Sequence, residues 1–74
     1  MFRATSSDGR ATVYEAINGF YLRNEQTGDT IGLGDGVDLF GDLPVGTDDF
    51  YRRLALLTEE LASELPDYFG GGDS

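Results

Sequence analysis

The strongest folding signal in the chain is the pair Asn18-Gly19, which lies between two stretches of alternating apolar and polar residues. A two-residue type I′ turn needs positive φ at both central positions, and Asn-Gly tolerates this best. The pair therefore predicts a β-hairpin in which Ile17 faces Phe20. Because successive side chains of a strand point to opposite faces, the hairpin has one apolar and one polar face. The apolar face holds Val13, Ile17, Phe20 and Leu22, and the other holds Tyr14, Tyr21 and Arg23.

Two similar turn signals, Asp8-Gly9 and Thr27-Gly28, flank this hairpin at the spacing typical of a β-meander. The first pairs Ala4 with Val13, and the second pairs Leu22 with Leu33. Both place the added apolar residues on the Val13 face, and a slip of one residue would invert that assignment. The sequence predicts strands over residues 2–7, 10–17, 20–26 and 29–33.

A single helix is predicted after the strands. Thr47 is a favourable N-cap, and Asp48 and Asp49 would lie in the first turn, where the helix dipole favours negative charge. The helix should run to about Leu65, because Pro66 disfavours its continuation. Its apolar stripe is Phe50, Leu54, Leu57, Leu61 and Leu65.

The predicted fold is α+β: an antiparallel meander of three or four strands, followed by one C-terminal α-helix packed on one face. Residues 1–69 would form a single small domain, and residues 70–74 a flexible Gly-rich tail. The connection at 34–46 is rich in Gly and Pro, and Val37–Phe40 within it is either a brief strand or a loop with apolar anchors.

Composition argues against catalysis and against a metal site. The chain has no cysteine and no histidine, so thiolate and imidazole ligands and a histidine base are absent, and no catalytic residue is assigned. Residues 33–41 partly match the calcium-binding nonapeptide through Gly34, Gly36, Asp38 and Phe40. One isolated repeat cannot build that site, so an acidic Gly-rich loop is expected, with no metal and no cofactor.

Charge gives the main functional indication. The chain contains fourteen acidic residues, five arginines and no lysine, so its net charge is −9. No basic residue occurs between Asn24 and Tyr51. Such a field repels nucleic acid and anionic lipid and attracts basic protein surfaces. Adaptation to high salt and plain solubility are alternative explanations. The acidic surface predicted to bind a basic partner consists of Asp29, Asp35, Asp38, Asp42, Asp48, Asp49, Glu59, Glu60 and Glu64.

The polar face of the sheet is a second candidate surface, because one helix can cover only the other face. Tyr14, Tyr21 and Arg23 lie on it, and Tyr and Arg are enriched at binding hot spots. A homodimer formed by stacking of two such faces is possible, and so is ordinary cross-strand packing without a partner. Leu56, on the outer side of the helix, is either a lone exposed leucine or an anchor among the glutamates.

In size, acidity and lack of cysteine the chain resembles phage-encoded inhibitors, including anti-CRISPR proteins and nucleic-acid mimics, and also acidic antitoxins. The resemblance is one of type and assigns no residues. It implies a non-enzymatic protein that blocks a basic nucleic-acid-binding surface on a partner protein. The alternatives are a structural or homodimeric module that uses the Tyr14/Tyr21 face and an antitoxin-like acidic partner. Met1-Phe2-Arg3 leads directly into polar residues, so a cytoplasmic location is expected, in the host cell if the protein is phage-encoded.

Overall fold

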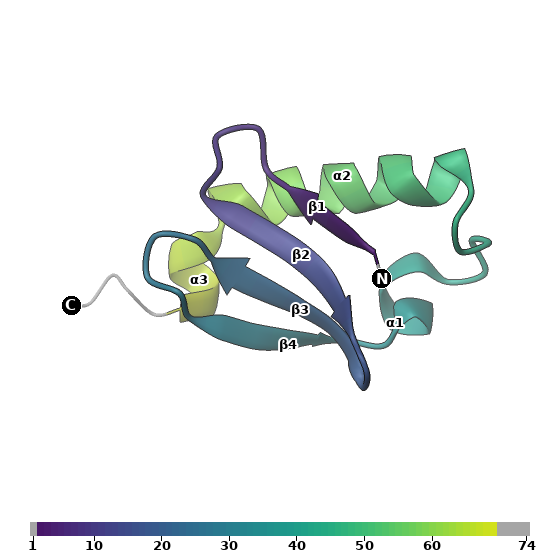
Figure 1. Cartoon of the computed structure of the whole chain (residues 1–74), viewed down its shortest axis with the longest axis horizontal. Helices are drawn as coiled ribbons and strands as arrows, with labels where there is room; N and C mark the ends of the chain where they lie inside the picture. The colour runs from purple at the N-terminus through teal and green to yellow at the C-terminus, as the bar shows by residue number, and fades with distance from the viewer. Residues whose placement is uncertain (1, 70–74) are drawn as a thin grey trace.

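The computed structural model describes residues 2–69, which form a four-stranded antiparallel sheet followed by a main helix that packs against it (Figure 1). The predicted α+β meander is therefore confirmed, with four strands. The strands follow chain order in the sheet, and the Gly-rich segment 70–74 lies outside the described residues. The elements are β1 Arg3–Thr5, β2 Ala11–Ala16, β3 Gly19–Asn24, β4 Thr30–Gly34, α1 Gly36–Phe40, α2 Asp48–Ser63 and α3 Leu65–Phe69.

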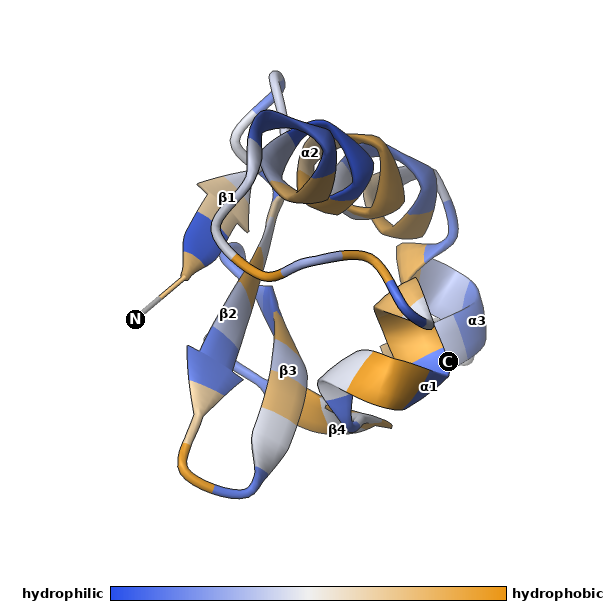
Figure 2. Ribbon diagram, turned by 90° about the vertical axis from the view of Figure 1, so that its right-hand side faces the viewer, coloured by the Kyte–Doolittle hydropathy of each residue, from blue (hydrophilic) through white to orange (hydrophobic). Residues whose placement is uncertain are grey.

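All three helices lie on the same side of the sheet (Figure 2). The apolar residues of α2 face the strands, and its polar residues face solvent, as the two colours along α2 show. The other side of the sheet carries no element of residues 2–69, so this face stays open. None of the helices within these residues has the length and apolar character needed to cross a membrane.

The central hairpin forms in a register different from the predicted one. Ala16 faces Gly19 and Val13 faces Leu22, which is a shift of two residues. The turn is not of type I′, because no non-glycine residue within 2–69 has positive φ. Gly19 is needed for another reason: its φ is 136°, and a Cβ there would lie 2.9 Å from the carbonyl oxygen of Gly34. A side chain at position 19 would therefore collide with the end of β4.

The shift of two residues leaves every strand residue on its predicted face, because side chains alternate with a period of two. Val13 and Leu22 are fully buried, as the pattern requires. Ile17 is the exception: it lies in the turn and is fully exposed, so its assignment to the core was wrong. Ile17 is exposed because the two-residue turn consists of Ile17 and Asn18 and not of Asn18 and Gly19.

The two outer hairpins differ in how well their registers were predicted. The first is confirmed, since Ala4 faces Val13. The third is shifted by two residues, because Leu22 faces Ile31 instead of Leu33, and the ladder is irregular between Phe20 and Tyr21. Ile31 and Leu33 both pack against the core, so the predicted face holds again.

Helix α2 begins where the sequence predicts and ends slightly earlier. The side-chain oxygen of Thr47 accepts a hydrogen bond from the backbone N–H of Phe50 at 3.2 Å. The helix ends at Ser63, and Pro66 lies in the first turn of α3, where its missing N–H needs no partner. The core side of α2 also includes Thr58, which is buried and donates its hydroxyl to the carbonyl oxygen of Leu54 at 2.8 Å.

Of the predicted stripe, Leu57 is half-buried and the other four residues are buried.

Residues 36–40 form a short helix, so the expectation of a strand or loop was wrong. Helix α1 places Phe40 in the core, with its ring 5.3 Å from that of Phe20 and 4.8 Å from that of Phe50. Phe2 packs on the other side of Phe50, with ring centroids 4.9 Å apart. This aromatic cluster joins β3, α1, α2 and the residue before β1. A segment of five residues shows no helical periodicity, which is why only the tertiary contact reveals it.

We expect the substitution Leu54→Ala to lower the free energy of unfolding by about 2–5 kcal/mol, because Leu54 is fully buried and its truncation leaves a cavity. Leu56→Ala is the matched control: this leucine is on the same helix but 57% exposed, and its loss should change stability by less than about 0.5 kcal/mol. Urea denaturation followed by circular dichroism measures both. Equal losses would contradict the packing described above.

Candidate functional site

The acidic residues predicted to bind a partner are all exposed, but they do not form one surface. Asp29 lies alone in the connection between β3 and β4. One group, from residues 35–49, surrounds α1 and the start of α2. Another group consists of Glu59 and Glu60 in the second half of α2 and of Glu64, the residue that caps its C-terminal end. The structure thus divides the predicted surface into separate parts.

A cavity of about 390 Å³ opens beside α1 and is called here the α1 cavity. Its apolar walls include the core rings of Phe20, Phe40 and Phe50. The polar side chains that line it are Glu15 and Asp35, and no basic residue contributes. Its full lining is Glu15, Phe20, Asp35, Gly36, Val37, Phe40, Gly41, Leu43, Val45 and Phe50. The result is an apolar hollow whose only charges are negative.

Val37 and Val45 are the residues of this site that the sequence analysis missed. They are 75% and 64% exposed, although they line the α1 cavity. Both stand in a segment otherwise rich in Gly, Asp and Pro. Apolar residues inside such a polar connection are the signal that could have identified them, because large exposed apolar side chains grouped together typically mark interaction sites.

A second hollow shares Phe40 and Leu43 with the α1 cavity and extends to residues of α2, and it is called here the α2 groove. Leu56 contributes to it together with Asp42 and Asp49, so the structure brings these three predicted residues together. The groove measures about 560 Å³ and is lined by Phe40, Asp42, Leu43, Pro44, Asp49, Arg52, Arg53 and Leu56. Unlike the α1 cavity it contains two arginines, so its charge is mixed.

Some of the predicted partner-binding acids have structural roles in the fold itself. Glu59 accepts hydrogen bonds from the backbone N–H of Ser7 at 2.7 Å and from its hydroxyl at 3.2 Å, which ties the β1–β2 turn to α2. Asp49 forms a salt bridge with Arg52 at 3.2 Å.

In the part of the chain that the structure describes, other carboxylates in the set form no hydrogen bond or salt bridge. They include those of Asp29, Asp42, Asp48, Glu60 and Glu64. These five are available to a partner without breaking an internal contact.

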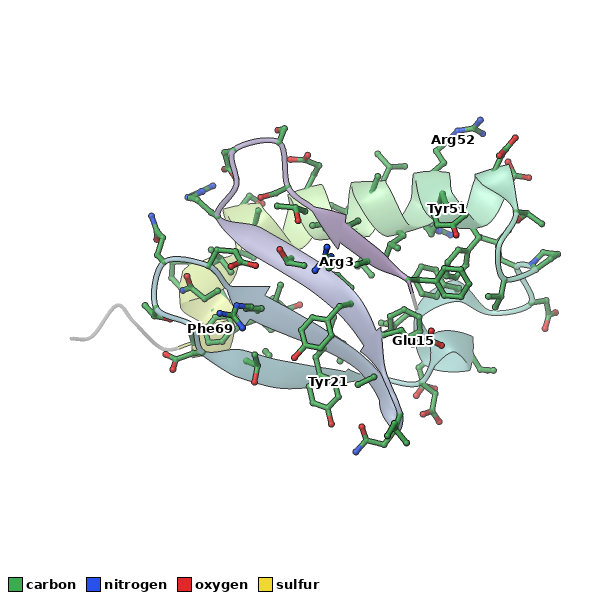
Figure 3. All side chains as sticks on the ribbon, viewed as in Figure 1. Arg3, Glu15, Tyr21, Tyr51, Arg52 and Phe69 are labelled. Carbon is green, nitrogen blue, oxygen red and sulfur yellow. The ribbon has the colours of Figure 1, made fainter. Side chains whose placement is uncertain are left out.

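The open face of the sheet carries Tyr14, Tyr21 and Arg23, as the alternation predicts. Figure 3 labels Tyr21 on this face. The tyrosines are directly cross-strand, not diagonal, and their rings stack at 5.9 Å with 20° between their planes. The hydroxyl of Tyr21 donates to the side-chain oxygen of Asn18 at 2.9 Å. Arg23 pairs with Glu25 at 3.3 Å. Leu56 is on a different side of the molecule, so it does not belong to this surface.

Within residues 2–69 no cluster of three or more Asp, Glu, His or Cys side chains has the geometry to hold a metal ion. Comparisons with protein-family models, with curated proteins and with solved structures found no match to this chain.

The β1–β2 turn contains Asp8, a carboxyl group whose pKa is clearly lowered. Asp8 accepts hydrogen bonds from the hydroxyl of Ser6 at 2.6 Å and from the backbone N–H of Arg10 at 3.0 Å, and the guanidinium of Arg10 lies at 2.6 Å. These contacts, that of Ser6 foremost, lower the pKa of Asp8 from 3.8 to about 2. Each stabilises the ionised carboxylate.

We expect Glu59→Ala to destabilise the protein by roughly 1 kcal/mol, because it removes charge-assisted hydrogen bonds that hold the β1–β2 turn on α2. Glu60→Ala is the control, since it removes the same charge one residue away without removing a contact. Its effect should stay within about 0.5 kcal/mol. Denaturation curves measure both, and hydrogen exchange at the amide of Ser7 should accelerate only in the Glu59 variant.

The pKa of Asp8 predicts a stability change in acid. Because the folded pKa of Asp8 lies below its unfolded value, its contribution is fully present above about pH 4 and is lost as the pH falls toward about 2. The difference in melting temperature between the wild type and Asp8→Asn should therefore shrink over this range. Asp42→Asn, which removes an acid with no internal contact, serves as the reference. A wild-type advantage over Asp8→Asn that is as large at pH 2 as at pH 5 would contradict the assignment.

Proposed function

We propose that this chain is a non-enzymatic protein-binding domain that docks through its α1 side on a basic surface of another protein. The observation that carries the proposal is the α1 cavity, an apolar hollow that has exposed Val37 and Val45 in its lining and only carboxylates among its charged lining residues. Apolar anchors surrounded by a charged rim are the usual arrangement of a protein interface.

The cavity and the charge would supply different parts of the binding energy. Burial of an exposed valine removes apolar surface from water, which contributes roughly 1.5–3 kcal/mol for a full side chain. The carboxylates of Asp35 and of the neighbouring Asp42 and Asp48 would steer a basic partner and fix its orientation, more through the rate of association than through affinity. A partner that offers an apolar side chain within a basic segment fits both features.

The more specific proposal is that the partner is a nucleic-acid-binding protein and that this domain blocks its basic groove. Support comes from the net charge of −9 and from the absence of lysine. The segment without basic residues, between Asn24 and Tyr51, includes α1 and most of the lining of the α1 cavity. Carboxylates there would take the place of phosphates. The domain would then act as an inhibitor by occupancy, without any chemical step.

The test combines capture with competition. Immobilised protein is used to capture partners from a bacterial lysate at low ionic strength, and a partner identified in this way is then titrated in purified form. Affinity should fall steeply as salt is added, because screening weakens long-range charge interactions. Added nucleic acid should displace the protein. Enriched partners that are neither basic nor nucleic-acid-binding would overturn the specific proposal.

Two double variants test whether binding depends on the α1 cavity or only on the overall negative charge of the protein. The double variant Val37→Ser with Val45→Ser keeps every charge and should weaken binding about tenfold or more, since each tenfold corresponds to about 1.4 kcal/mol. Glu60→Gln with Glu64→Gln removes two charges elsewhere and should have the smaller effect. Equal affinity of the valine variant and the wild type would overturn the role of the α1 cavity.

A further inference from the structure

The open face of the sheet differs in charge from the rest of this acidic molecule. Arg3 and Arg23 lie on this face, and none of the strand residues that share it is acidic. Arg3 faces Tyr14 across the β1–β2 pair, and Tyr14 faces Tyr21 across the β2–β3 pair. An arginine and two stacked tyrosines therefore form a row across three strands (Figure 3).

A groove of about 600 Å³ runs over this face. Arg3, Tyr14 and Arg23 line it, together with Phe2, Thr12, Glu15 and Glu25. Arg3 forms no salt bridge with any of residues 2–69, so its guanidinium is available to a ligand. Arg23 is held only by Glu25, in a pair whose side chains are 49% and 34% exposed. An exposed pair of this kind contributes little to stability and exchanges readily with an incoming carboxylate.

We infer that this face binds a short acidic peptide segment that also carries an aromatic side chain. Guanidinium groups bind carboxylates through paired, charge-assisted hydrogen bonds, which would place the acidic side chains of the segment on Arg3 and Arg23. The stacked pair Tyr14 and Tyr21 offers an aromatic surface beside them, where an additional ring gains by offset or edge contact. The occupant follows from the two arginines of this face. Because Glu15 and Glu25 also line the groove, an acidic segment binds there by contacting the unpaired guanidinium of Arg3 and by displacing Glu25 from Arg23.

A nucleic acid fits this face less well than an acidic peptide. Double-stranded DNA carries one charge per about 1.7 Å of axis, and its affinity depends on many phosphate contacts. The groove offers only Arg3 and Arg23, on a protein whose net charge is −9. A short peptide brings few charges, so the acids that repel it are mainly Glu15 and Glu25 in the groove itself. Repulsion from more distant acids is screened beyond about 8 Å at physiological ionic strength.

The experiment titrates a short fluorescent peptide of alternating glutamate and tyrosine into the whole chain, with anisotropy as the readout. Arg3→Gln with Arg23→Gln should weaken binding about tenfold or more. Arg52→Gln with Arg53→Gln removes the same charge from α2 and should change affinity less than about twofold, because these arginines lie outside the groove. A thermal melt of each variant establishes that it is folded.

A second measurement uses only the wild type, so it does not depend on the folding of a variant. Peptide addition should shift the amide resonances of Tyr14, Tyr21 and Arg23 more than those of α1. Absence of binding, equal losses in the two double variants, or amide shifts elsewhere would overturn the inference. Tighter binding of single-stranded oligothymidine would assign the face to nucleic acid instead. Self-association in sedimentation that Tyr14→Ala with Tyr21→Ala abolishes would assign it to a second copy of the chain.

Discussion

Phe50 is the residue around which the other elements of this small domain are packed. Its side chain is fully buried, and its ring lies within 5 Å of the rings of Phe2 and Phe40. Phe40 in turn contacts Phe20 of β3. The cluster therefore connects the N-terminal edge of the sheet, the hairpin and α1 to the start of α2. A chain of 74 residues without cysteine has no disulfide to share this role, so the aromatic contacts hold together the region that forms the α1 cavity.

The two-layer arrangement also separates two kinds of surface chemistry. All helices cover one face of the sheet, which leaves Tyr14 and Tyr21 uncovered on the other (Figures 2 and 3). Carboxylates gather around α1 and along α2, while Arg3 and Arg23 stand on the open face. A single layer of helices thus produces an acidic, apolar side and an aromatic side that carries two arginines. The proposed functions of the two sides follow from this separation and not from the net charge alone.

Some acidic residues of this protein stabilise the fold through internal hydrogen bonds, and others only contribute charge to the surface. Glu59 holds the β1–β2 turn against α2, and within that turn Asp8 binds Ser6 and Arg10. These acids satisfy specific donors, which a general need for solubility would not require. The acids that satisfy no donor, such as Asp42 and Asp48, are those that remain available to a partner. The sequence alone cannot tell these acids from Glu59, because it shows only that all of them are acidic residues. The difference lies in which donors the fold brings near each carboxylate.

The sequence by itself determined the fold class, the core face of the sheet and the start of α2. It could do so because these features depend on local signals. The alternation of apolar and polar residues places Val13 and Leu22 in the core in either register, and Thr47 caps α2 through a hydrogen bond from the backbone N–H of Phe50, three residues further along the chain. Only the tertiary structure decided the registers of the second and third hairpins, the exposure of Ile17, the helix at 36–40 and the α1 cavity. Each of these depends on contacts between segments distant in the chain, such as the approach of Gly34 to Gly19, which no local pattern encodes.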